Sequence, residues 1–206
     1  MKLYYSVTSP YARKVRLVIE EKGLQSAIDC ELIDPFADLP QLLAANPLGR
    51  VPTLLLDDGQ ALYGSQVICA YLDSQALSPV LVPAEGWARW QVLRHEALAD
   101  GLIDAAYDIV MERKREAPQR SSHWLEHWSR EIRRALDAME KSADELDTGL
   151  SLAHLATAAA LGYLELRMPE MLSRDGADGW ESWPRLCQWY ASFSLRPSMQ
   201  ATRPGD

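Results

Sequence analysis

Cysteine is scarce in this sequence, and its placement excludes several kinds of chemistry. Only Cys30, Cys69 and Cys187 are present, and they are too far apart to form a CxxC pair or a zinc-ligand spacing. A small, odd number of separated cysteines is typical of a protein from a reducing compartment. We therefore expect neither a redox dithiol nor a structural zinc site.

Long apolar runs are also missing. Residues 1–5 lack the apolar stretch of a secretory signal peptide. The most apolar segment, residues 155–164, is far shorter than the roughly 20 residues that a membrane-spanning helix needs. The sequence thus predicts a cytoplasmic protein that has no membrane partner.

Positive charge is in the minority. The chain has 21 Lys and Arg against 29 Asp and Glu, which gives a net charge of −8. Nucleic-acid phosphates would be repelled by such a protein, and the short basic run at 113–115 suits a solvated helix end. We expect no nucleic-acid partner, and an anionic small molecule would need a local positive patch.

The first part of the chain alternates between strand-like and helix-like segments. Apolar patterning predicts strands at 2–6, 27–33, 53–56 and 60–63, and helices at 11–23 and from residue 65 onwards. Asp57-Asp58-Gly59 joins the last two strands, so they should form a hairpin. A strand–helix–strand unit followed by a hairpin and a helix predicts a mixed sheet with helices on its faces.

The rest of the chain contains no credible strand. Two prolines at 78–85 indicate a linker. Helical spacing then continues through 90–109, 124–143, 151–167 and 184–193, with a loop at 173–179 and 184–193 as the last helix. Residues 151–167 are apolar on almost every side, so we expect that helix in the middle of a bundle. We predict an α/β domain at 1–77, a linker at 78–85 and an all-helical domain at 86–206.

Four stretches together carry a family resemblance. They read TSPYARKVR at 8–16, NPLGRVPTL at 46–54, LYGSQVI at 62–68, and WPRL at 183–186 with the later RPS and RP at 196–198 and 203–204. With this order and spacing, the sequence resembles the glutathione S-transferase family, most of all small bacterial members whose first motif reads Ser-Pro-aromatic. The resemblance implies a thioredoxin-like N-terminal domain, an all-α C-terminal domain and glutathione as co-substrate.

Ser9 is the candidate for thiol chemistry. It precedes Pro10 and a helical stripe, so it should be the N-cap at the positive end of a helix. A helix N-terminus can lower a thiol pKa from about 8.5 to between about 3.5 and 7.5. The resemblance implies that Ser9 donates a hydrogen bond to the glutathione thiolate, with Tyr5 as second choice and Thr8 as third. A plain N-cap without a ligand is the alternative.

Two further segments complete the expected glutathione site. In thioredoxin-like folds the proline that matches Pro52 follows a cis peptide bond, which would present the backbone of Val51 to an extended peptide. A trans proline entering an edge strand is the alternative. Ser65 precedes a helical stripe, so its hydroxyl and the first helical N–H groups can receive the γ-glutamyl carboxylate, with Gln66 in reach.

Other positions depart from the family pattern. Gly64 stands where many members have Glu or Asp, which binds the γ-glutamyl ammonium group or shapes the pocket. Between Asp34 and Gly49 there is no Lys, Arg or His, so only Gln41 and Arg50 could serve the glycyl carboxylate. Losing a charged partner costs about 1.5–3 kcal/mol, or roughly ten- to a hundredfold in affinity. We expect weak glutathione binding or a different ligand.

The histidines predict no metal site. His154, three residues after Ser151, stands where the family usually has the Asp that caps a buried helix, and we interpret it as a structural residue that caps less well. His123 and His127 are four residues apart and could share a helix face, but no third ligand is apparent. We interpret His95 as a surface or groove residue.

The resemblance implies a glutathione transferase, active in detoxification. The enzyme would hold the thiol as thiolate and direct it to a hydrophobic electrophile or a peroxide between the two domains, without a covalent enzyme intermediate. A weakly catalytic or non-catalytic binding or regulatory protein, favoured by Gly64 and by the missing basic residue, is the alternative. Because residues 5–14 contain no cysteine, a cysteine-based thiol–disulfide enzyme is not expected. Family members are usually homodimers, joined through the helices that begin near Ser65 and Gly86.

Overall fold

The computed structural model describes residues 1–75, 78–147, 149–172, 180 and 182–204. Its contacts divide the chain into two compact units, one made of Met1–Arg89 with Arg196–Asp206 and the other of Trp90–Leu195. The first unit thus takes in residues from both ends of the sequence. The domain limits drawn from sequence stay a prediction, and the expected loop at 173–179 lies outside the described residues.

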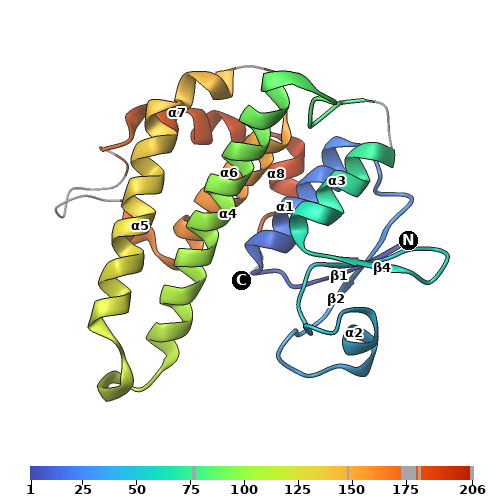
Figure 1. The fold of residues 1–206 in the computed structure, drawn as a ribbon, viewed down its shortest axis with the longest axis horizontal. Helices are drawn as coiled ribbons and strands as arrows, with labels where there is room; N and C mark the ends of the chain where they lie inside the picture. The colour runs from blue at the N-terminus through green and yellow to red at the C-terminus, as the bar shows by residue number, and fades with distance from the viewer. Residues whose placement is uncertain (76–77, 148, 173–179, 181, 205–206) are drawn as a thin grey trace. The chain divides into compact units, whose positions relative to one another are not determined.

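A four-stranded mixed sheet forms the centre of the first unit (Figure 1). Its strands, in the order β2-β1-β3-β4, are β2 Asp29–Leu32, β1 Lys2–Tyr5, β3 Thr53–Leu55 and β4 Ala61–Tyr63. β1 pairs in parallel with β2 and antiparallel with β3, and β3 pairs antiparallel with β4. This is the predicted mixed sheet, including the hairpin between β3 and β4.

Helices cover both faces of this sheet. The helices of this unit are α1 Pro10–Glu21, α2 Pro40–Ala45, α3 Ser65–Gln75 and α8 Pro197–Ala201, of which α8 contacts α1. α1 and α3 pack on each other on one side of the sheet, and α2 lies on the other side (Figure 1). Tyr4 packs with Ile33 and Leu42 in the small core beside α2. Because side chains alternate along a strand, the fully buried Leu3 faces the side of α1 and α3.

The described residues of the second unit form helices joined by short loops, with no strand among them. Its long helices are α4 Gly86–Lys114, whose first turn belongs to the first unit, α5 Ser122–Lys141, α6 Leu152–Arg167 and α7 Pro184–Phe193. Three short 3₁₀ helices connect them, namely η1 Ala117–Gln119, η2 Ala143–Asp147 and η3 Pro169–Leu172. Every residue from 152 to 164 in α6 is buried, which confirms the prediction of a helix at the centre of a bundle.

Two helix limits drawn from sequence are wrong. The helix expected to run to residue 143 ends at Lys141, because the Ser142 N–H and hydroxyl close its last carbonyls and Ala143 begins η2. α7 is not the last helix, since α8 follows it with Pro197 in its first turn. A five-residue helix is too short to produce an apolar stripe, so periodicity could not reveal it.

Candidate functional site

Three segments of the first unit meet at one edge of its sheet. Tyr4 is paired with Thr53, and Thr53 with Tyr63. Because both pairings are antiparallel, β1 ends, β3 begins and β4 ends at the same edge. The turn that carries Ser9, the Val51–Pro52 bond and the start of α3 at Ser65 therefore lie along this edge, which we call the site edge.

Ser9 is the N-cap of α1, as its sequence context predicts. Its Oγ accepts a hydrogen bond from the Ala12 N–H at 3.2 Å, and its carbonyl accepts one from the Arg13 N–H at 2.9 Å. None of the residues that the structure describes accepts a hydrogen bond from the Ser9 hydroxyl. A hydroxyl has one hydrogen and two lone pairs, so capping leaves the hydrogen of Ser9 available to a ligand.

The two other candidate donors are placed differently. The Tyr5 ring is half-buried, and the guanidinium carbon of Arg16 lies 4.7 Å from its centroid. A cation over the ring fixes the ring against α1. Thr8 is exposed and directly precedes the N-cap.

The bond between Val51 and Pro52 is cis, as predicted. The backbone just before it is held by two buried polar side chains. Asn46 Nδ2 and Thr53 Oγ1 donate to the Arg50 carbonyl at 2.9 and 2.8 Å, and Asn46 Nδ2 also lies 3.1 Å from Thr53 Oγ1. This network fixes the direction of the chain where it enters β3. Sequence reasoning missed it, although the motif contains both side chains.

α3 begins at Ser65, which is 7% exposed. Gly64 before it has φ +84°, a conformation that disfavours any side chain, and a Cβ there would meet only Val67, at 3.9 Å. The position that lacks the Glu or Asp of many family members thus also has a backbone conformation that favours glycine. Gln66, next in the helix, is exposed.

Positive charge near the site edge is confined to few positions. Arg50 is exposed and is the only Lys, Arg or His between residues 23 and 88. α2 carries no charged residue, and its exposed Gln41 is flanked upstream by the exposed Asp34 and Asp38. Arg50 is therefore the cationic residue nearest to α2 in the sequence, and it is the candidate partner for an anion bound beside that helix.

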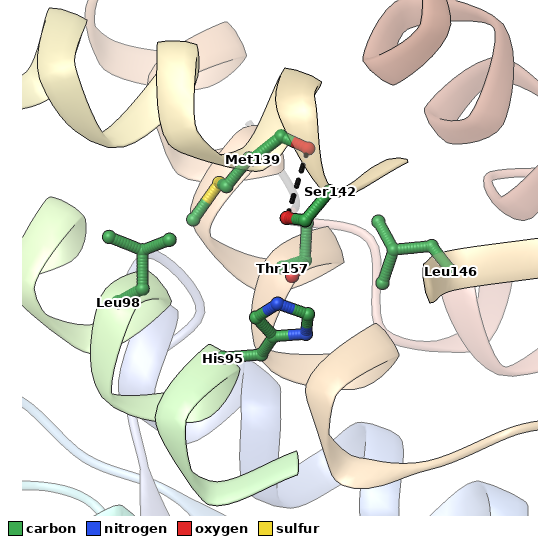
Figure 2. Close-up of a pocket in the computed structure, with 6 residues that line it drawn as sticks. All are labelled: His95, Leu98, Met139, Ser142, Leu146 and Thr157. Carbon is green, nitrogen blue, oxygen red and sulfur yellow. Dashed lines mark hydrogen bonds between the residues drawn. The ribbon is translucent and has the colours of Figure 1, made fainter. Parts of the chain in front are cut away.

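A cavity in the helical unit is too small for a substrate (Figure 2). Its volume is about 10 Å³, close to the space that one water needs. It is lined by His95, Leu98, Met139, Ser142, Leu146 and Thr157.

His95 is buried and not at the surface as expected, because the apolar side of α4 carries it inward; its Nε2 lies 3.6 Å from Glu145. Burial lowers the pKa of His95, against the opposing effect of Glu145.

His154 has the structural role expected of it. Its buried Nδ1 accepts the Ser151 N–H at 3.1 Å and lies 2.9 Å from Ser151 Oγ. Its Nε2 then carries the hydrogen and donates to the Leu146 carbonyl at 3.1 Å. His123 and His127 instead contact the Trp124 ring, and no cluster of three metal-ligating side chains occurs within the described residues.

Within the described ranges, no helix is long and apolar enough to span a bilayer.

Comparison with known proteins places the chain in a family. The model of the glutathione S-transferase N-terminal domain matches residues 8–75. The uncharacterized GST-like protein YibF of Escherichia coli (strain K12) is 33% identical over 209 residues, covering 99% of this chain and 98% of that protein. A stringent starvation protein A homolog of Pasteurella multocida (strain Pm70) is 34% identical over 127 residues, 56% of this chain and 58% of that protein.

The solved structures agree. A glutathione transferase family member from Pseudomonas fluorescens Pf-5, crystallised with bound glutathione, has 38% sequence identity and a TM-score of 0.93 over 100% of this chain and 99% of its own. The fold is therefore a thioredoxin-like domain with a helical C-terminal region. By sequence, by fold and by its N-terminal domain, the chain belongs to the glutathione S-transferase family.

Proposed function

We propose that this protein is a glutathione transferase that binds glutathione along the site edge and holds its thiol as a thiolate. The observation that carries this proposal is the meeting of Ser9, Val51–Pro52 and Ser65 at one edge of one sheet. The bound glutathione of the Pseudomonas fluorescens relative supports the choice of ligand. The activated thiolate would attack a hydrophobic electrophile or a peroxide.

Ser9 is the proposed donor to the sulfur. Its hydroxyl hydrogen is not used by the cap, and it stands at the positive end of a 12-residue helix. Lowering a thiol pKa by two units requires about 2.7 kcal/mol. A hydroxyl donating to a charged sulfur contributes about 1.5–3 kcal/mol, and part of a helix dipole adds to it. Tyr5 is the weaker candidate, because its ring is engaged by Arg16.

The rest of the peptide would follow the site edge. The N–H and C=O of Val51 would pair with the cysteinyl backbone of glutathione, as an added strand pairs with an edge. The γ-glutamyl carboxylate would meet Ser65, Gly64, Gln66 and the N-terminus of α3. Arg50 would serve the glycyl carboxylate. Catalysis then comes from positioning and charge stabilisation, with no covalent bond to the protein and no metal.

Calorimetric titration with glutathione and a turnover assay with a generic electrophile test this proposal. Ser9→Ala should bind glutathione within about twofold of the wild type but turn over roughly ten- to a hundredfold more slowly, the loss of one hydrogen bond to a charged group. Ser6→Ala, a neighbour in the same turn, is the matched control and should change neither. Equal turnover in Ser9→Ala and the wild type would move the donor role to Tyr5 or Thr8.

A binding or regulatory protein is the second candidate. It is favoured by Gly64, by the absence of a cation on α2 and by the likeness to a stringent starvation protein A homolog. Glutathione binding without turnover of any electrophile or peroxide would support it. An absence of binding at millimolar glutathione would refute the transferase proposal.

A homodimer belongs to the same proposal. Exposed apolar side chains occur on both helices expected to join the subunits: Trp87 and Trp90, 70% and 60% exposed, in the first turns of α4, and Val67, 53% exposed, in α3. Burial of such side chains against a second copy would remove large apolar areas from water. Light scattering should give twice the chain mass, and Trp90→Glu should shift it to the monomer. A cytoplasmic location and a role in detoxification are likewise proposed.

A further inference from the structure

The Arg-Pro-Ser motif at 196–198 has no part in the proposed chemistry, yet the structure ties it to α1. Arg196 donates to Glu21, the last residue of α1, through Nε to Oε1 and Nη2 to Oε2, both at 2.8 Å. Ser198 Oγ donates to the same Oε1 at 2.5 Å. The Glu21 side chain is only 11% exposed. One carboxylate thus receives three hydrogen bonds from residues about 175 positions later.

The contacts continue from this anchor toward the other end of α1. Arg13 Nη2 donates to the Met199 carbonyl at 3.4 Å, and Arg16 Nη2 to the Ala201 carbonyl at 3.1 Å. Residues 196–202, which we call the closing segment, therefore contact α1 through the side chains of Arg13, Arg16 and Glu21. Three of its residues are buried, namely Ser198, Met199 and Thr202.

Both arginines that hold the closing segment also touch the site edge. The Arg13 N–H donates to the Ser9 carbonyl, so one residue joins the closing segment to the N-cap. The Arg16 guanidinium lies over the Tyr5 ring while donating to Ala201. Each of the two leading candidates for thiolate donor, Ser9 and Tyr5, is thus linked to the closing segment through a single arginine.

We propose that the closing segment is a strap that positions the thiolate-binding end of α1, with Glu21 as its anchoring, positioning residue. The inference rests on the proposed glutathione site. It assigns a role in ligand ionisation to residues that never touch the ligand, and it holds whether Ser9 or Tyr5 contacts the sulfur.

The length of α1 makes small tilts costly at its far end. Twelve residues span about 18 Å at ~1.5 Å per residue. A tilt of about 3° around the Glu21 end would displace Ser9 by about 1 Å, and a displacement of that size can lower a rate on the order of a hundredfold. The strap opposes this tilt through its hydrogen bonds to Arg13, Arg16 and Glu21.

The charge state of the anchor suits this role at neutral pH. Burial raises the pKa of Glu21, but hydrogen bonds from Arg196 and Ser198 and the charge of Arg196 outweigh burial, so its pKa lies below the ordinary value. The carboxylate is ionised, and its bonds to Arg196 are charge-assisted.

The test compares Glu21→Ala with Glu20→Ala. The Glu20 carboxylate accepts an exposed hydrogen bond from Gln25 Nε2 at 2.7 Å. The measured quantities are kcat, KM for glutathione and the pH at which bound glutathione ionises, followed by thiolate absorbance. Glu21→Ala should lower kcat about tenfold and raise the ionisation pH, with KM changed less than twofold. Glu20→Ala should match the wild type. Glu21→Gln, which keeps the side-chain size, should show the same changes to a smaller extent if Glu21→Ala folds poorly.

A variant in which Glu21 and Arg196 exchange their charges distinguishes a positioning role of this pair from a purely stabilising one. The double variant Glu21→Arg with Arg196→Glu should regain part of the lost kcat and of the thiolate shift. Folded Glu21 variants that melt earlier but keep wild-type kcat and ionisation pH would overturn the strap. If the wild type does not bind glutathione, the proposed function fails by itself. Amide exchange at residues 11–13 then decides the strap: faster exchange in Glu21→Gln than in Glu20→Ala supports it, and equal exchange overturns it.

Discussion

The two units of the molecule are fixed by different forces. In the sheet unit, buried polar and charged side chains join distant segments, as Lys22 with Asp73, Asn46 with Thr53 and Glu21 with Arg196 do. The helical unit is instead built around α6, whose buried face is almost entirely apolar. Hydrogen bonds are directional and apolar burial is not. In the unit that carries the candidate site, directional contacts therefore help to fix how these segments lie relative to one another.

Removal of the buried ion pair between Lys22 and Asp73 should have the largest effect. Asp73 accepts from Lys22 Nζ at 2.9 Å and from the N–H groups of Leu81 and Val82 at 3.0 Å, and Lys22 Nζ is fully buried. Asp73→Ala would remove the carboxylate beside that buried ammonium group, while the Asp73 and Pro79 carbonyls remain as acceptors. We expect the sheet unit to lose about 3–5 kcal/mol of unfolding free energy, measured by hydrogen exchange in denaturant.

The matched control for this pair is Asp57→Ala. Asp57 pairs with the terminal ammonium group of Met1, but its side chain is 86% exposed, so solvent screens the pair. Exchange in the sheet unit should stay near the wild-type value. Equal losses in both variants would mean that burial does not set the strength of these pairs.

An apolar deletion in the helical unit should come next. Leu161 is fully buried in α6, and Leu161→Ala should cost about 2–5 kcal/mol through lost burial and a cavity. Tryptophan fluorescence during denaturation can follow it, since six of the seven tryptophans lie within 90–195. Leu166→Ala on the same helix, at a position 39% exposed, should cost far less. A comparable loss at both positions would contradict a core centred on α6.

Removal of the buried His154 side chain that caps the α6 N-terminus should have a smaller effect. His154→Ala removes the acceptor for the Ser151 N–H and the donor to the Leu146 carbonyl. We expect a loss of about 1–3 kcal/mol, confined to the helical unit. An unchanged melting curve would show that water replaces both contacts.

The stability of the two units should depend on pH in different ranges, and this is the smallest of the expected effects. Burial lowers the pKa of His95, so protons favour the unfolded state: its contribution is full above about pH 6.5 and falls as the pH drops below that value. Glu21 also has a lowered pKa, so its contribution is lost only as the pH falls below about 4. His95→Gln should remove the loss in the helical unit between pH 7 and 5. A decline that persists in this variant would assign it to other groups.

Sequence patterns correctly predicted the structural features that depend on residues close together in the chain. The strand and helix order, the cap at Ser9 and the cis bond at Pro52 follow from local signals or from the family motifs. The burial of His95 and the pairing of Glu21 with Arg196 could not be found, because each depends on segments that are remote in sequence. Gly64 shows a third case, in which the sequence revealed a missing charge but not the backbone conformation that glycine serves.

The strap has a consequence for synthesis of the protein. A ribosome releases Glu21 and the rest of α1 long before it makes Arg196, 175 residues later. During that interval the sheet, α1 and α3 can assemble, but α1 lacks its contacts with the closing segment. The whole helical unit leaves the ribosome before the closing segment does. Native contacts of such long range slow folding. A nascent chain that already binds glutathione should therefore ionise its thiol only late, at the moment when residues 196–202 leave the exit tunnel.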